Sequence, residues 1–455
     1  MVAEFFQRES DALARACHAM ARAFARGGAL IPFGVGAAAT DAAHAAVEFM
    51  HPVIVGKRAL PAIAPSNDPS GASTLSRLAG PNDIALAISH GAVDPETSRF
   101  VSAAHARGLL TIEMTAEAGS TQPLFVDAEG PAAQYRFAVP TRDPAIVQEV
   151  HETAYHVLWE LVHVFFEQPG LLDEGEACIT CGDVAVTARV AEVRGATAVI
   201  EKDGAREEIA IDLVEDVRVG DQLLCHAGVA LERVDSDSED PAAFLYPFQS
   251  AGPRSDLDAV LADVRASTLE KAGEVTALRR AIDTEAISSC AQELRRRLEG
   301  GGRLIACGNG GSATDAQDMV ADALDRGWPA LALNNDAATV TAVANDVGSD
   351  QIFARQLIAL GRPEDVCVAI STSGGSANVI AAVEEAKSRG MANVALAGYD
   401  GGRLAELDSL DHLFVVPSDH IPRIQEAQAT IYHLLLEAIG DRSPAGDRSP
   451  GGAAL

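Results

Sequence analysis

The sequence predicts an α/β protein in which two similar halves, each a parallel sheet flanked by helices, lie on either side of a small β-barrel in the chain. Three observations predict this fold class. Strand-like and helix-like segments alternate in both end portions, which is typical of parallel sheets. The same motifs occur twice in the same order, as an internal repeat of about 150 residues, which indicates duplicated domains. The middle of the chain instead has short alternating runs, as in antiparallel sheets.

The first half is expected to span residues 1–168. Its opening helical segment ends at a pair of glycines, and a short apolar strand then leads into the turn Gly34-Val35-Gly36. A second strand ends at Ser89-His90-Gly91, and a long helix over residues 148–166 closes the half. The alternation predicts helices on both faces of one parallel sheet.

The other half is expected to span residues 257–440 and repeats these elements. A strand runs into Gly308-Asn309-Gly310-Gly311, a second strand ends at Ser371-Thr372-Ser373, and a helix over residues 425–439 closes it. Residues 177–234 read as the β-barrel, with a hairpin turn at Asp203-Gly204. Two polar segments complete the chain, and we expect a linker at 235–256 and a disordered tail at 441–455.

The composition excludes several classes of function. The 455 residues include 65 acidic and 35 basic ones, for a formal net charge of -30. Such a chain repels nucleic acid and anionic membrane surfaces. Seven cysteines, an odd number in a long chain, favour a reducing compartment. No continuous stretch of about 20 apolar residues exists, so we expect a cytoplasmic protein without a transmembrane helix.

Two loops of the second half have the composition of a phosphate site. Residues 308–313 and 371–376 are rich in glycine and serine, and each lies where a strand ends and a helix begins. Backbone N–H groups and the positive end of a helix favour an anion there. Both loops follow parallel strands, so they should face one crevice. Tight turns needed only for packing are the alternative interpretation.

Further motifs in order give this half a family resemblance. They are the run 344–348, Phe353-Ala354-Arg355-Gln356 and Arg423-Ile424-Gln425-Glu426. With the two loops, they make residues 302–440 similar to phosphoheptose isomerases, which have sugar isomerase (SIS) domains and interconvert sedoheptulose 7-phosphate and glycero-manno-heptose 7-phosphate. The resemblance implies a sugar-phosphate substrate bound by Asn309, Gly310, Gly311, Ser312, Asn345, Asp346, Ser371, Thr372, Ser373, Ser376 and Gln425.

The same resemblance implies a divalent metal, expected to be zinc. The family pattern places a His and a Glu four residues apart on the first helix, and a Gln and a His eight apart on the last. The first half matches all four positions, with His44, Glu48, Gln148 and His156. An i, i+4 pair lies on one helix face, so both side chains can reach one ion. The second half has the alternative set Asp318, Asp322, Gln425 and His433.

These matches lead to a hypothesis of a composite site. The second half would hold the phosphate, and the first would supply the metal and the proton-transferring groups Glu48 and His156. Aldose–ketose isomerisation needs such groups because a proton moves between C1 and C2 through an enediol. The alternative is that the first half is a degenerate copy whose four matching residues have no role.

The middle segment resembles a second family. Cys178-Ile179-Thr180-Cys181 and the run Val-Gly-Asp…His-Ala-Gly-Val-Ala over residues 219–230 are similar to the HypC/HupF hydrogenase maturation chaperones. This resemblance implies that Cys178 or Cys181, with His226, carries an iron–cyanide–carbonyl unit. A structural zinc half-site and a redox pair remain alternatives for the two cysteines.

Two functions therefore follow from the sequence. One is a sugar-phosphate aldose–ketose isomerase resembling sedoheptulose 7-phosphate isomerase. The other is a nickel–iron hydrogenase maturation factor, whose partners would be the hydrogenase large subunit or maturation proteins and whose SIS halves bind a phosphosugar or act as a scaffold. Because the resemblance implies tetramers of single SIS domains, a chain with two such domains is expected to form a homodimer.

Overall fold

The computed structural model describes most of the chain, and the statements below concern that part. The described residues are 1–52, 57–65, 75, 77–91, 95–117, 133–172, 186–195, 197–202, 205–211, 214, 217–226, 229–233 and 256–442. No helix in these ranges is both long and apolar enough to cross a membrane. Of the segments assigned from sequence, the hairpin turn Asp203-Gly204, the linker 235–255, the tail beyond residue 442 and the two cysteines at 178 and 181 lie outside these ranges.

The first half contains a four-stranded parallel sheet in the order β1-β2-β3-β4. Its elements are α1 (Val2–Ala25), β1 (Leu30–Gly34), α2 (Ala38–Met50), β2 (Ile84–Ile88), α4 (Pro95–Ala106), β3 (Leu110–Ala116), β4 (Tyr135–Val139) and α5 (Pro144–Phe166). Strands β1 and β2 are apolar along almost their whole length, as expected for strands covered on both faces. Helices α1 and α5 lie on one face and α4 on the other.

The second half contains a five-stranded parallel sheet in the order β11-β10-β12-β13-β14. Its elements are α8 (Thr284–Glu299), β10 (Leu304–Cys307), α9 (Gly311–Asp325), β11 (Ala330–Ala332), α10 (Ala337–Asp346), α11 (Ala354–Leu360), β12 (Val366–Ser371), α12 (Ala377–Ser388), β13 (Ala392–Gly398), β14 (His412–Val416) and α13 (Ile421–Ile439). Among the described residues of the first half, a single parallel bridge, Leu30 to Ala62, lies where the second half has β11. The expected duplication of an α/β unit is thus confirmed.

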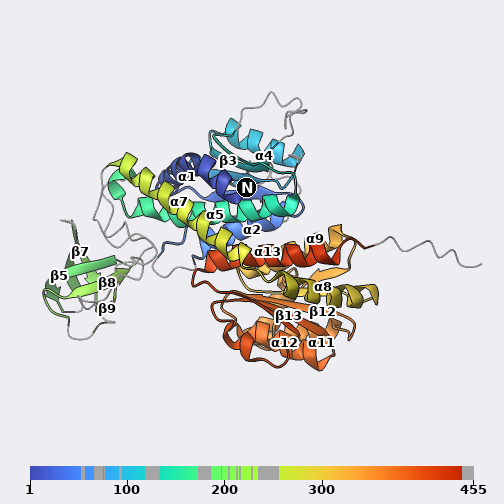
Figure 1. Cartoon of the computed structure of the whole chain (residues 1–455). Helices are drawn as coiled ribbons and strands as arrows, with labels where there is room; N and C mark the ends of the chain where they lie inside the picture. The colour runs from blue at the N-terminus through green and yellow to red at the C-terminus, as the bar shows by residue number, and fades with distance from the viewer. Residues whose placement is uncertain are drawn as a thin grey trace, which may run out of the picture.

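The middle segment forms the expected small barrel. Strands β5 (Val186–Arg194), β6 (Thr197–Lys202), β7 (Ala205–Ala210), β8 (Gln222–His226) and β9 (Val229–Arg233) close in the order β5-β6-β7-β9-β8. Its core is small and apolar, and it includes Val190, Ile200 and Leu223. Figure 1 shows the barrel to one side of the two α/β halves.

Helix α7 (Leu257–Arg280) precedes the second sheet in sequence but packs against helices α1 and α5 of the first half. Asp256 caps it by accepting hydrogen bonds from two backbone N–H groups, which fixes where the helix begins. Its apolar residues Val260, Leu261 and Val264 belong to the first core. This helix therefore links the two halves through buried contacts.

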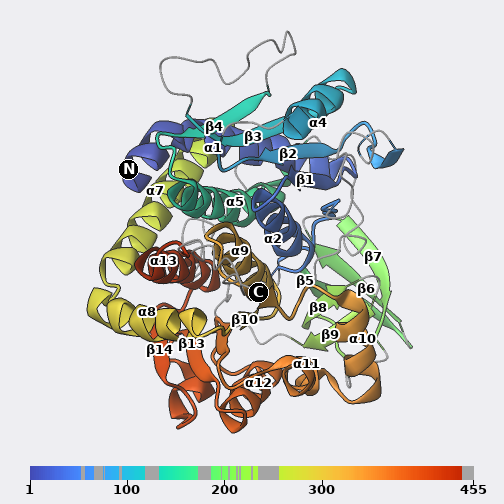
Figure 2. The ribbon, with the colours of Figure 1, turned by 90° about the vertical axis from the view of Figure 1, so that its right-hand side faces the viewer.

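Four helices meet between the two sheets. Helix α2 packs against α9, and α5 packs against α13 (Figure 2). Helix α5 is buried on nearly all sides, which is typical of a helix in the middle of a protein. Polar side chains on these helices are consequently enclosed between the halves, and they form the candidate site.

Candidate functional site

Two buried histidines from the first half form the centre of this interface. His44 lies on α2 and His156 on α5, and their ring centroids are 5.2 Å apart. His44 Nδ1 lies 3.1 Å from the Tyr155 hydroxyl and 3.5 Å from a carboxylate oxygen of Asp315. Its Nε2 accepts a hydrogen bond of 3.1 Å from the side-chain amide of Gln425, a residue of the second half. The site is therefore built from both halves.

His156 is held by a chain of buried charges. Its Nδ1 lies 3.0 Å from Glu426 Oε1, and Glu426 is paired with Arg423 at 2.7 Å. Arg423 also donates to Glu160 at 2.9 Å, and Glu160 pairs with Lys271 of α7. A carboxylate on Nδ1 fixes the ring and its tautomer, so that Nε2 is the nitrogen left to bind a ligand. That Nε2 has no hydrogen-bond partner among the described residues.

Several other buried polar atoms around these histidines also have no hydrogen-bond partner within the described part of the chain. Ligand atoms of His44, Glu152 and His156 all lie within 4.8 Å of one another. Both Glu152 oxygens, Glu48 Oε2 and Gln425 Oε1 make no hydrogen bond there, although Glu48 Oε1 lies 3.6 Å from His44 Nε2. A buried polar group without a partner costs about 1–3 kcal/mol, and more if charged. Imidazole and oxygen donors in such a cluster fit a divalent metal.

The glycine loop of the second half touches this cluster. Gly311 begins α9, and a Cβ placed on it would lie 2.0 Å from Gln425 Nε2 and 2.5 Å from His44 Nε2. Only a glycine fits here, because real Cβ contacts are longer than 3.0 Å. The expected phosphate loop and the expected metal ligands are thus adjacent.

The second serine-rich loop lies next to the first. The side-chain amides of Asn309 and Asn378 hydrogen-bond to each other at 2.8 and 3.0 Å, and Ser371 Oγ lies 3.3 Å from Ser376 Oγ. The other predicted loop residues are Gly310, Ser312, Thr372 and Ser373. Asn345 and Asp346 are exposed at the end of α10, where Asn345 donates to Asp346 at 2.7 Å.

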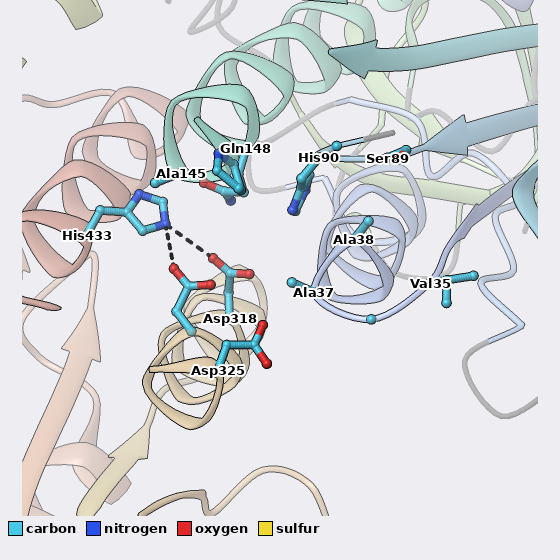
Figure 3. Close-up of a pocket in the computed structure, with 14 residues that line it drawn as sticks. Val35, Ala37, Ala38, Ser89, His90, Ala145, Gln148, Asp318, Asp325 and His433 are labelled. Carbon is cyan, nitrogen blue, oxygen red and sulfur yellow. Dashed lines mark ion pairs between the residues drawn. The ribbon is translucent and has the colours of Figure 1, made fainter. Parts of the chain in front are cut away.

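A second, equivalent cluster lies on the other side of the interface (Figure 3). His433 Nε2 lies 3.7 Å from Asp318 and 3.5 Å from Asp322, and its Nδ1 lies 3.0 Å from Glu149. Gln148 of the first half lines the same pocket and donates to Asp41 at 3.2 Å. The pocket has a volume of about 270 Å³ and includes the first-half turn Val35-Gly36-Ala37-Ala38.

The Gln-Glu pair of each half therefore lies at the histidine cluster of the other half. Gln425 and Glu426 of the second half contact His44 and His156, while Glu149 contacts His433 and Gln148 lines its pocket. The sequence grouped Gln148 with the first-half histidines and Gln425 with Asp318, Asp322 and His433. The structure reverses both glutamine assignments, because α5 and α13 pack against each other across the interface.

The electrostatics of the two clusters differ. Burial, with Asp315 and Glu426 nearby, raises the pKa of Glu152 well above its usual value. Burial opposes protonation of His433, yet the neighbouring carboxylates of Asp318 and Glu149 raise its pKa to about 10. The second cluster thus contains its own cation, a His433 imidazolium held by carboxylates. In the first cluster, His156 Nε2 and both Glu152 oxygens have no hydrogen-bond partner within the described ranges.

Two functional candidates were not found by the sequence reasoning. Glu426 was visible only as part of a family motif, and its contact with His156 joins residues 270 positions apart. Glu152 lies four residues before His156, the same i, i+4 spacing as in the His44–Glu48 pair, and this spacing was a detectable signal.

For the barrel, His226 is the last residue of β8, and its backbone pairs with Val229.

Comparison with known proteins places these features in families. Residues 271–398 match the SIS domain model, and residues 184–242 match the HupF/HypC family model, a match that begins after Cys181. The chain is thus a SIS-domain protein with an internal HupF/HypC region. Over 162 residues, 34% of the chain, it is 47% identical to the phosphoheptose isomerase of Shewanella sp. strain ANA-3, and it covers 82% of that relative. The chain belongs to the phosphoheptose isomerase family.

Two solved structures are among the similar proteins. Phosphoheptose isomerase from Neisseria gonorrhoeae is 39% identical, with 39% of this chain and 98% of that chain covered and a TM-score of 0.38. The C-terminal domain of glucosamine-fructose-6-phosphate aminotransferase from Francisella tularensis covers 96% of this chain, with 93% of its own length matched, 9% identity and a TM-score of 0.51. The latter likeness concerns the fold alone.

Proposed function

We propose that the protein is an aldose–ketose isomerase acting on a phosphorylated sugar of the sedoheptulose 7-phosphate type, at a single composite site between its halves. The observation that supports this most directly is the contact of Gly311 with His44 and Gln425. It joins the loop expected to bind the phosphate to the cluster expected to hold the metal. The relatives that match 162 residues of this chain are phosphoheptose isomerases, which supports the substrate class.

Different residues would bind the phosphate, hold the metal and transfer the proton. The glycine and serine loops would bind the phosphate through backbone N–H and hydroxyl groups, as anions are bound at helix N-termini. His44, Glu48, His156 and Gln425 would hold a divalent metal, which when bound polarises the sugar carbonyl. Glu48 would carry a proton from C1 to C2 of the ketose, and the hydroxyl proton passes from O1 to O2. The exchange is balanced and consumes no oxidant or reductant.

Turnover of sedoheptulose 7-phosphate, followed by proton NMR in heavy water with and without added zinc, tests this proposal. We expect Glu48→Gln to abolish both isomerisation and solvent exchange at C1. The matched control is Asp322→Asn, which changes the equivalent position of the second cluster and should leave turnover intact. Wild-type turnover in the Glu48→Gln variant would contradict the proposal.

A second function is proposed for the barrel because residues 184–242 match the HupF/HypC family. We propose that this region binds a maturation partner of nickel–iron hydrogenase, with Cys178 or Cys181 and His226 as ligands of an iron unit. Co-purification with a hydrogenase large-subunit precursor, followed by iron analysis, tests it. The double variant Cys178→Ala/Cys181→Ala should lose the iron, and undiminished iron would count against this role.

A further inference from the structure

Glu152 is an acidic residue at the metal cluster that the family pattern does not include. It lies on α5 one helical turn before His156 and is completely buried. One of its oxygens lies within 4.8 Å of ligand nitrogens of both His44 and His156. Neither oxygen has a hydrogen-bond partner within the part of the chain that the structure describes. A buried carboxylate without a partner is costly, so this position needs a cation or a proton.

The internal repeat shows that this acid is specific to one cluster. Gln148 and His156 correspond to Gln425 and His433, so Glu152 corresponds to Ala429. The second cluster therefore lacks this carboxyl group, and His433 Nε2 there lies 3.7 Å from Asp318 and 3.5 Å from Asp322. The first cluster has a surplus of open acidic oxygens, because Glu48 Oε2 is also unpartnered among the described residues.

We propose that Glu152 is a fifth protein ligand, which makes this a centre of two histidines, two carboxylates and one amide oxygen that accommodates a five- or six-coordinate Mn(II) or Fe(II) ion. Two carboxylates balance the charge of a divalent ion. Zinc in proteins is most often four-coordinate, whereas two histidines with carboxylate ligands and open positions are typical of non-haem iron. The inference rests on the metal centre of the proposed function and adds a ligand and a metal class to it.

Removal of Glu152 should therefore lower the affinity for Mn(II) more than the affinity for Zn(II). An ion that uses all five ligands loses one when Glu152 is removed, whereas a four-coordinate ion can keep His44, Glu48, His156 and Gln425. Loss of second-shell partners already costs about 10–100-fold in metal affinity, so loss of a ligand should cost at least about 100-fold for Mn(II). The loss for Zn(II) should be much smaller.

The test uses the full chain, stripped of metal by a chelator, as wild type, Glu152→Gln and Glu152→Ala. Mn(II) binding is followed by electron paramagnetic resonance and Zn(II) binding by competition with a chromogenic chelator. We expect Mn(II) affinity to fall about 100-fold or more in both variants, with a smaller change for Zn(II). Melting temperatures of the metal-free proteins check that both variants are folded.

Asp322→Asn, in the second cluster, is the matched control and should bind Mn(II) as the wild type does. If both variants are folded and bind Mn(II) with wild-type affinity, Glu152 is not a ligand and the inference is overturned, while the proposed isomerase site stands. If the wild type isomerises sugar phosphate but binds neither ion, the inference and the metal part of the proposed function both fail. If it binds Mn(II) through Glu152 but does not isomerise, only the proposed activity fails.

Discussion

Replacing Gly311 with alanine should separate the two parts of the composite site. The new Cβ would lie 2.0 Å from Gln425 Nε2, 2.5 Å from His44 Nε2 and 3.2 Å from Gln425 Cδ, whereas ordinary contact begins at 3.4 Å. The amide of Gln425 would have to move from 2.0 to 3.4 Å, and the imidazole of His44 from 2.5 to 3.4 Å. Both side chains are buried, so neither can retreat without disturbing its neighbours.

Two magnitudes follow from this displacement. Overpacking of an interior typically costs about 1–3 kcal/mol, which urea unfolding of the variant would measure. A misplacement of about 1 Å in a reacting group can lower turnover about 100-fold, so kcat/KM for the sugar phosphate should fall by that order. Affinity for zinc should fall with it, because two proposed ligands move together.

The first half provides the control for this substitution. Its corresponding residue is Ala37, which lines the pocket of the second cluster, so Ala37→Gly makes the reverse change away from His44 (Figure 3). We expect that variant to keep wild-type turnover. The reasoning would be refuted if Gly311→Ala kept kcat/KM and zinc affinity within about threefold of the wild type, because the loop and the cluster would then not act as one site.

Three other predictions concern the surroundings of the site. Glu426→Gln should weaken zinc binding about 10–100-fold in a chelator competition, because it removes the carboxylate on His156 Nδ1, whereas Glu149→Gln on His433 should not. The pKa of His433 is raised to about 10, so its ion pairs stabilise the fold fully below pH 6.5 and are lost as the pH rises through about 10; the melting temperature should fall over this range, and less steeply in His433→Asn. Light scattering should give twice the chain mass of 47.4 kDa, and a monomer would contradict the expected dimer.

The sequence predicted the fold because its signals are local. Gly34 is the last residue of β1 and Gly308 directly follows β10, and each begins a glycine turn that is visible in the sequence, so these strands could be placed before their packing was known. The spacing of His44 with Glu48 also placed two side chains on one helix face correctly. Such patterns depend only on neighbouring residues, and the duplicated order of motifs strengthened each of them.

The sequence could not predict which half provides each glutamine. Gln148 and Gln425 occupy the same position in their copies, and only the packing of α5 on α13 places Gln425 beside His44. The contacts of Glu426 and the unpartnered state of Glu152 also depend on tertiary packing. Helix α7 is a similar case, because its sequence position precedes the second sheet whereas its apolar face packs on the first half.

The exchanged Gln-Glu pairs have an evolutionary consequence. In an oligomer of identical subunits a substitution enters every active site at once, so no site can change alone. Here the two copies are joined in one chain, and the pocket of the second cluster has Asp318, Asp322 and Ala37 where the first cluster has His44, Glu48 and Gly311. One pocket can therefore diverge while the other keeps its residues. Neither half can be lost, however, since each still supplies side chains to the other's centre.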